Sequence, residues 1–408
     1  MKRYSLIFVF CFIGMTVFAQ GTDMSFYTSE YTRSGSSFNQ RLTVLETVRD
    51  AGLTGIGEFY HEALKFLLLR IPDIRNITDH DAAEKSAVIL CQGLGAERYT
   101  AAAPELWQVV EFFDVAKNDN EGHAMSAALN ALGQVGGRDF LPQIVLRLNN
   151  FNTLSITNAE ARRRVQVAAI GCINALEAFQ DAAGFRPIFF ASIGSYDART
   201  REVASRALPN IAEDPGEVIA EIIRDPSSDP SVKLAAWREM LRTRASDSSK
   251  ARVAAVALAT GWNYSTANIS FQTNLREMRK SAIDSIRQFG AVDASVYENL
   301  ERSYSSNFLS NTPDYDEIVV TLNALTALRT DEAIELLLKF LRDLHSRRST
   351  GPWRQKERQV FEWVISCIGV TRTQSVEARI LLTNIQRTDI YTPQERNWAR
   401  NALIRISN

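Results

Sequence analysis

The sequence predicts an all-α fold in which helix pairs stack as repeats. From about residue 80 onward, the motif Ala-apolar-x-x-apolar recurs roughly every forty residues to the end of the 408-residue chain. A repeat of this length indicates a stacked helical array, because a single helix pair cannot bury its own apolar face. No strand hairpin is predicted after Arg41. The nine copies of the motif begin at Ala87, Ala128, Ala169, Ala207, Ala236, Ala282, Ala324, Val364 and Ala402.

The first nineteen residues are typical of a cleaved signal peptide. The basic pair Lys2-Arg3 precedes an almost wholly apolar stretch from Leu6 to Phe18, and Val17-Phe18-Ala19 supplies a small-x-small cleavage pattern. We therefore expect cleavage after Ala19 and a mature protein that begins at Gln20. The signal is bacterial in style, which predicts a periplasmic or secreted protein.

Two other fates of this N-terminus are less favoured. Cys11 could mark a lipoprotein, but Phe10 stands where lipidation requires a small residue, and apolar residues continue after Cys11. The apolar stretch is too short and wrongly flanked for a membrane-spanning helix. Because no other run of eighteen apolar residues occurs, no transmembrane helix is predicted.

Charge and cysteine content narrow the function classes further. Without residues 1–19 the chain keeps 44 basic and 47 acidic residues, which argues against a general nucleic-acid binder or a general binder of anionic membranes. Cys91, Cys172 and Cys367 remain, each on an apolar helical position of a different repeat. We expect buried thiols rather than a disulfide framework.

The remaining chain reads as a polar tether followed by helices. Residues 20–40 are rich in Gly, Thr, Ser and Tyr and are expected to be a tether, and helix patterns run from 41 to 408. Four acceptor residues stand three positions before a glutamate, the spacing of a helix capping box. They are Asp81, Thr157, Asp314 and Thr392, the last followed by Pro393 at the expected first helical position.

Each motif helix is expected to be followed by a short turn and a partner helix. The alanines let the paired helices approach closely, while larger aliphatic side chains fill the space between units. We expect Leu129, Leu208, Leu325 and Leu403 to be buried between helices. Partner helices are predicted near residues 140–148, 217–223, 292–304 and 331–344.

Three stretches resemble the second helix of HEAT-like repeats: Asp197–Ile211, Asp229–Ala236 and Ala127–Gly133. The family's second-helix pattern is an acidic residue, then a basic one, then alanines at three- and four-residue spacing that end in Ala-Leu. The resemblance covers about residues 41–408. It implies an armadillo-type α-solenoid of roughly nine HEAT-like helix-pair repeats stacked into a superhelix. Members of this family are mostly interaction scaffolds, so the resemblance implies no particular activity.

Residues for catalysis or metal binding are scarce. The four histidines, at positions 61, 80, 123 and 345, are too far apart in sequence for a zinc motif. His61-Glu62 resembles one His-Glu pair of HEAT-like iron hydroxylases, which need several such pairs. No nucleophile elbow or phosphate-binding loop occurs. We therefore predict no catalytic residue, no metal and no cofactor, and an enzyme on the HEAT-like fold is the less favoured alternative.

The long connections after the partner helices carry the predicted contact residues. These connections span about 149–158, 191–197, 260–273, 304–314 and 344–356, and in a stacked array they emerge at one edge. Exposed aromatic side chains at that edge would anchor a protein partner. Alternatively, each aromatic folds back over the core between units. The predicted contact residues are Trp262, Tyr264, Arg347, Arg348, Trp353 and Arg354.

Residues 345–358 are locally basic, with five Arg or Lys residues against the single acid Glu357. This run offers weak binding to an anionic lipid or glycan as an alternative to a protein partner. The favoured prediction is an exported, non-enzymatic repeat scaffold that binds a protein partner in the cell envelope and does not bind nucleic acid.

Overall fold

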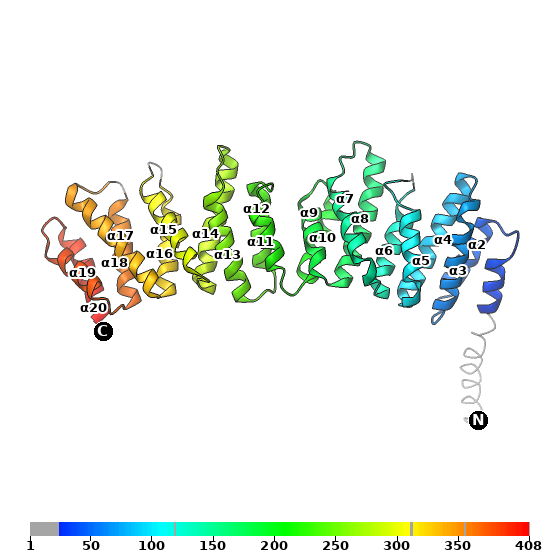
Figure 1. Cartoon of the computed structure of the whole chain (residues 1–408), viewed down its shortest axis with the longest axis horizontal. Coiled ribbons are helices and arrows are strands. Elements are labelled where there is room, and N and C mark those ends of the chain that lie inside the picture. Colours follow the sequence, from blue (N-terminus) through cyan, green and yellow to red (C-terminus); the bar gives the residue numbers. More distant parts are fainter. Residues whose placement is uncertain (1–23, 118–119, 311–312, 355, 408) are drawn as a thin grey trace, which may run out of the picture. The chain divides into compact units, whose positions relative to one another are not determined.

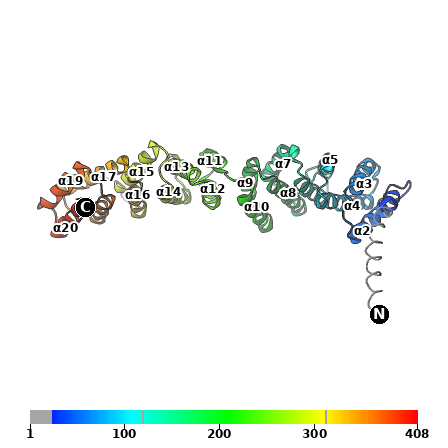
Figure 2. The ribbon, with the colours of Figure 1, turned by 90° about the horizontal axis from the view of Figure 1, so that it is seen from below.

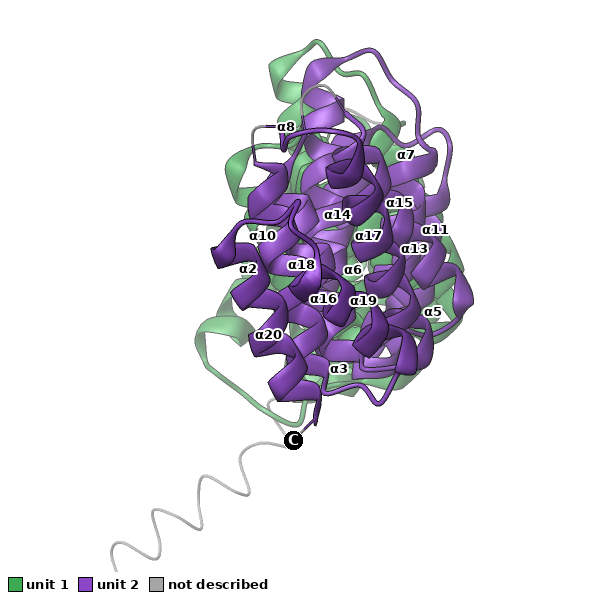
Figure 3. Ribbon diagram, turned by 90° about the vertical axis from the view of Figure 1, so that its left-hand side faces the viewer, with its two compact units in different colours: residues 1–212 green, residues 213–408 purple. Residues whose placement is uncertain are grey.

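The computed structural model describes residues 24–117, 120–310, 313–354 and 356–407, and within these ranges every regular element is a helix and no strand occurs (Figure 1). The signal peptide predicted for residues 1–19 lies outside the described residues. The chain divides into two compact units, residues 1–212 and 213–408 (Figure 3).

In the described part of the first unit, short 3-10 turns η1 (Ile71–Asp73), η2 (Thr100–Ala102), η3 (Arg138–Phe140) and η4 (Ala182–Gly184) connect some of the α-helices. Those α-helices are α2 (Phe38–Asp50), α3 (Gly57–Arg70), α4 (Ile77–Ala96), α5 (Ala103–Phe112), α6 (His123–Val135), α7 (Leu141–Thr153), α8 (Ala159–Phe179), α9 (Phe185–Ile193) and α10 (Ala198–Ile211).

The second unit begins with a helix that belongs to the partner layer. Its helices are α11 (Gly216–Arg224), α12 (Pro230–Arg242), α13 (Asp247–Asn263), α14 (Ile269–Phe289), α15 (Ala294–Phe308), α16 (Tyr315–Leu328), α17 (Asp331–Thr350), α18 (Glu357–Thr371), α19 (Val376–Arg387) and α20 (Pro393–Ser407).

Within each unit the helices form two layers. Each motif-bearing helix packs on the next motif-bearing helix along the chain. The order is α4, α6, α8, α10 in the first unit and α12, α14, α16, α18, α20 in the second. The partner helices form the other layer, for example α13 against α15 and then α17 (Figure 2). The all-helical, repeat-like packing predicted from the motif is confirmed.

Polar contacts between neighbouring helix pairs follow the same period. His61 Nε2 lies 3.1 Å from Glu105 Oε2, Trp237 Nε1 donates to Ser281 Oγ, and Trp353 Nε1 donates to Glu395 Oε1. The partners are 44, 44 and 42 positions apart, which is one repeat. Each helix pair therefore depends on its immediate neighbours, as expected for repeat packing.

The motif residues form the contact between successive motif helices. All nine copies lie on helices, and the first residue of each copy is at most 3% exposed. Leu129, Leu208 and Leu325 are buried, as expected. Leu403 is only half-buried, so the expectation of full burial is wrong here: α18 and α19 pack on α20 without covering this side chain fully.

The N-terminal segment and two of the four predicted caps differ from expectation. Residues 24–32, inside the expected tether, are helical, and the fully buried Tyr31 accepts a hydrogen bond at its carbonyl from Arg41 Nε. Tyr31 supplies the apolar anchor that a tether would lack. Asn76 rather than Asp81 caps α4, which places Asp81 inside the helix, and Asn158 rather than Thr157 caps α8.

The other two caps are confirmed. Asp314 accepts a hydrogen bond from the Glu317 backbone at the start of α16. Thr392 and Glu395 form a reciprocal capping box, with Pro393 as the first residue of α20.

The connections are shorter than expected, because the partner helices run further than their patterns indicated. Helix α7 continues to Thr153, α13 to Asn263, α15 to Phe308 and α17 to Thr350. Within the second unit the connections that follow α13, α15 and α17 lie at one edge, as predicted for stacked pairs (Figure 1).

Cys91, Cys172 and Cys367 are free thiols, the first two fully buried and the third half-buried. Burial raises the pKa of the Cys172 thiol to about 12. None of the described helices is both long enough and apolar enough to cross a membrane.

The register of the motif can be tested with two leucines at the same motif position in the second unit. Leu325→Ala should lower the free energy of unfolding by about 2–5 kcal/mol, because Leu325 is fully buried and the substitution leaves a cavity. Leu403→Ala should cost roughly half of that or less, because Leu403 is already half-exposed. Urea denaturation followed by circular dichroism measures both, and equal losses would contradict the register.

Candidate functional site

The structure brings the predicted contact residues to one edge of the second unit, at the ends of the partner helices α13 and α17. Trp262 and Tyr264 close α13, Arg347 and Arg348 lie in the last turn of α17, and Trp353 and Arg354 follow in the connection to α18. Both tryptophans and Tyr264 are half-buried rather than fully exposed.

Trp262 belongs to a network inside the second unit. Its Nε1 donates to Ser303 Oγ at 2.8 Å, and the Arg279 guanidinium stacks 3.9 Å from the centre of its ring. Arg279 in turn makes a two-pronged ion pair with the fully buried Glu317. Trp262 thus covers a buried charge pair that joins α14 to α16, and its indole already has its hydrogen-bond acceptor.

Trp353 is held in the same way by Glu395. Its Nε1 donates to Glu395 Oε1 at 2.9 Å, and its ring packs 5.0 Å from the ring of Phe361. Burial by itself would raise the pKa of Glu395, but hydrogen bonds from the Thr392 backbone, Trp353 and Arg358 together lower this pKa below its usual range. Both tryptophans therefore have the intramolecular contacts of core lids, the second interpretation of the sequence.

Most of the basic residues between 345 and 358 are also occupied. Arg347 pairs with Glu357, and Arg358 pairs with Glu395. Arg348 donates to the carbonyls of Gly351 and Ile390. Three of the five cations predicted from composition therefore connect parts of the chain, while Arg354 and Lys356 are exposed and, among the described residues, make no ion pair.

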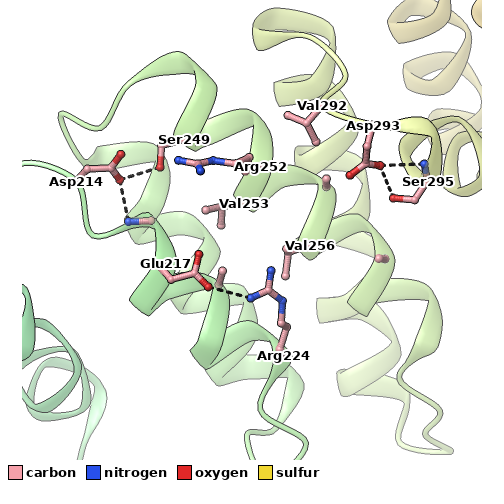
Figure 4. A pocket seen from close by; sticks show the side chains of 14 residues that line it. Asp214, Glu217, Arg224, Ser249, Arg252, Val253, Val256, Val292, Asp293 and Ser295 are labelled. Atoms are coloured by element: carbon pink, nitrogen blue, oxygen red, sulfur yellow. Dashed lines mark hydrogen bonds and ion pairs between the residues drawn. The ribbon is translucent and has the colours of Figure 1, made fainter.

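A groove on the partner-helix face of the second unit is more open to a ligand. It has a volume of about 520 Å³ and runs between α11, α13 and the start of α15 (Figure 4). Ala220, Val253, Val256 and Ala259 line it with apolar surface, and Val292, 39% exposed, stands at the α15 end. The small side chains of α11 and α13 leave the space between these helices unfilled.

The rim of this α11–α13 groove carries five charged residues, four of which are engaged. Asp214 Oδ1 accepts from Ser249 Oγ at 2.7 Å and from the Gly216 backbone at 2.9 Å. Glu217 pairs with Arg224, and Asp293 caps α15 by accepting from the backbone and hydroxyl of Ser295 (Figure 4).

Arg252 is the remaining charge on the rim. It is exposed on α13, and among the described residues it has no hydrogen-bond or ion-pair partner. Asp214 and Asp293 each lie at the positive N-terminal end of a helix, which offsets part of their negative charge. Arg252 is therefore the group in the groove that is free to receive an anionic side chain.

The groove offers little for catalysis. Its lining contains no histidine, cysteine or lysine, and each of its carboxylates already accepts hydrogen bonds or an ion pair. In the ranges that the structure describes, no group of three or more His, Cys, Asp or Glu side chains is arranged to hold a metal ion. An apolar floor with a polar rim is instead typical of a binding surface.

The sequence pattern did not identify this groove. Residues 214–216 fall in the short turn expected before the partner helix near 217–223, and α13 carries Arg252 four residues before Val256 and seven before Ala259. Small residues at this spacing on a partner helix are the one available signal, because they mark a helix face that leaves space beside its neighbour.

No protein-family model matches the chain, and no curated protein matches it in sequence. The resemblance to HEAT-like repeats therefore depends on the motifs of this chain and on their helical packing.

The structural role of Trp262 leads to a prediction about stability. Trp262→Ala removes the cover over the Arg279–Glu317 pair and should lower the free energy of unfolding by about 1–3 kcal/mol. Trp262→Phe keeps an aromatic cover, loses only the hydrogen bond to Ser303, and should cost about 1 kcal/mol. Urea denaturation checks both values. Unchanged stability in the alanine variant would show that Trp262 is an external anchor after all.

Proposed function

We propose that the protein is an exported, non-enzymatic HEAT-like repeat scaffold that binds a protein partner through the α11–α13 groove. The observation that carries the proposal is the unpaired Arg252 beside an apolar floor in an open groove between helices. The groove takes the place of the C-terminal edge as the proposed contact, because Trp262 and Trp353 are held by partners within the chain.

The groove suits a short amphipathic segment of a partner protein. The half-buried Val256 and Ala259 present a narrow apolar strip above the buried Val253, and small aliphatic side chains fit on it. Arg252 can pair with a carboxylate on the same segment. An Arg-carboxylate pair beside an apolar strip fixes both position and orientation, since its hydrogen bonds are directional. The proposed occupant is therefore an acidic, aliphatic segment rather than a basic one.

The repeat packing supports the proposal that the protein is an α-solenoid scaffold. Nine motif copies at a period of about forty residues favour one α-solenoid of about nine helix pairs wound into a superhelix. Such arrays present long surfaces to partners while each unit is stabilised by its neighbours.

Export is supported by the N-terminal sequence pattern and can be tested directly. If the signal is cleaved after Ala19, the chain purified from the envelope fraction of an expressing bacterium should begin at Gln20. Mass spectrometry of the intact protein and of its N-terminal peptide measures this. A chain that still carries Leu6 to Phe18 and stays in the cytoplasmic fraction would contradict export.

The groove is tested by photo-crosslinking in cells. A benzoylphenylalanine at position 256 should crosslink to a polypeptide, because the half-buried Val256 lines the groove. The same photoreactive residue at position 376 is the matched control, because Val376 is an exposed valine on α19 outside the groove.

The second part of this experiment reverses the charge of Arg252 in the groove. Arg252→Glu should reduce the crosslink from position 256 by about tenfold or more, since a charge-assisted hydrogen bond contributes about 1.5–3 kcal/mol. Mass spectrometry should identify an acidic, aliphatic peptide at the crosslink. Equal crosslinking from positions 256 and 376, or no effect of Arg252→Glu, would overturn the proposed site.

A further inference from the structure

Three arginines from successive motif helices meet in a second hollow of the C-terminal unit. Arg329 follows the last residue of α16, Arg372 follows the last residue of α18, and Arg405 lies in the last turn of α20. Together with Gly369 and Val370 they line a pocket of about 450 Å³. This pocket shares no residue with the α11–α13 groove.

Close packing of α18 on α20 brings Arg405 to this place. A Cβ atom at Gly369 would lie 3.1 Å from Ala402 Cα and 3.5 Å from Arg405 Cδ. Gly369 therefore lets the two helices approach at the motif residue Ala402 and lets the stem of Arg405 lie over it. Since α16, α18 and α20 are consecutive motif helices, the repeat itself places the three arginines around one pocket.

The pocket is cationic without a compensating acid. No carboxylate is among its lining residues, and within the described chain none of the three guanidinium groups has an ion pair or a hydrogen bond. The C-terminal ends of α16, α18 and α20 contribute about half a negative charge each. Three full positive charges outweigh these three partial ones, so the pocket attracts anions.

We propose that this pocket binds a tetrahedral oxyanion, a phosphoryl group in particular. Guanidinium forks recognise phosphate oxygens in pairs, and a phosphoryl group presents three acceptor oxygens. Three arginines from three helix ends match three oxygens, whereas a planar carboxylate offers only two. The same chemistry is presented by free inorganic phosphate and by the phosphate of a lipid headgroup, so the source is left to experiment.

Two of these arginines can be replaced so that a loss of binding is distinguished from a loss of folding. Arg329 has φ 54° and Arg372 has φ 52°, a left-handed conformation that glycine adopts more easily. Arg329→Gly and Arg372→Gly should therefore remove a guanidinium group without lowering the melting temperature.

Isothermal titration calorimetry of the mature protein with inorganic phosphate and with pyrophosphate tests the site. Arg329→Gly, Arg372→Gly and Arg405→Gln should each weaken binding by about tenfold, and the triple variant should not bind. Arg400→Gln is the matched control, because Arg400 is an exposed arginine on α20 outside the pocket and should leave affinity unchanged.

Flotation with phosphatidylglycerol vesicles, compared with phosphatidylcholine vesicles, identifies the source. Binding to the anionic vesicles that the triple variant loses indicates a lipid headgroup, while binding to free phosphate or pyrophosphate alone indicates a soluble ligand. The proposal is overturned if the wild-type protein binds none of these probes, or if the triple variant binds as tightly as the wild type.

Discussion

Close contact between successive motif helices is the constraint on which the rest of the structure depends. The first motif residue is an alanine in eight of the nine copies, and it is buried in all of them. A small side chain here lets helix axes approach to about 8–10 Å, so that the neighbouring leucines and isoleucines fill the remaining space. Because every helix pair is completed by the next, the polar contacts between pairs recur one repeat apart.

This dependence explains why conspicuous side chains at the edge of the second unit are internal. The end of each partner helix lies beside the following pair, where an indole can reach an acceptor one repeat later. Trp262 reaches Ser303, and Trp353 reaches Glu395, the residue that also closes the capping box of α20. An aromatic residue in that position connects consecutive units and has little surface left for a partner.

The helices and their register could be predicted from the sequence, while the sites could not. Periodicity and small motif residues are local signals, and they identified both the motif helices and most partner helices. Two caps were assigned to the wrong residue, because Asn76 and Asn158 are equally suitable acceptors at slightly different positions. The exposure of Trp262 depends on Ser303, 41 residues later. The freedom of Arg252 depends on the acids of the same groove being engaged by other partners. Neither property can be predicted from the residues that are near in the sequence.

Strained arginines help to show which features of such an array carry function. Arg98, at the end of α4, has the same left-handed conformation as Arg329 and Arg372. A side chain held in this region costs about 1–3 kcal/mol, yet Arg98 lines neither the α11–α13 groove nor the pocket of Arg329, Arg372 and Arg405. Strain alone therefore does not mark a site. What distinguishes Arg329 and Arg372 is that Gly369 lets α20 approach and adds Arg405 to the same hollow. In a repeat fold, a candidate site forms where consecutive units place side chains of the same charge around one pocket.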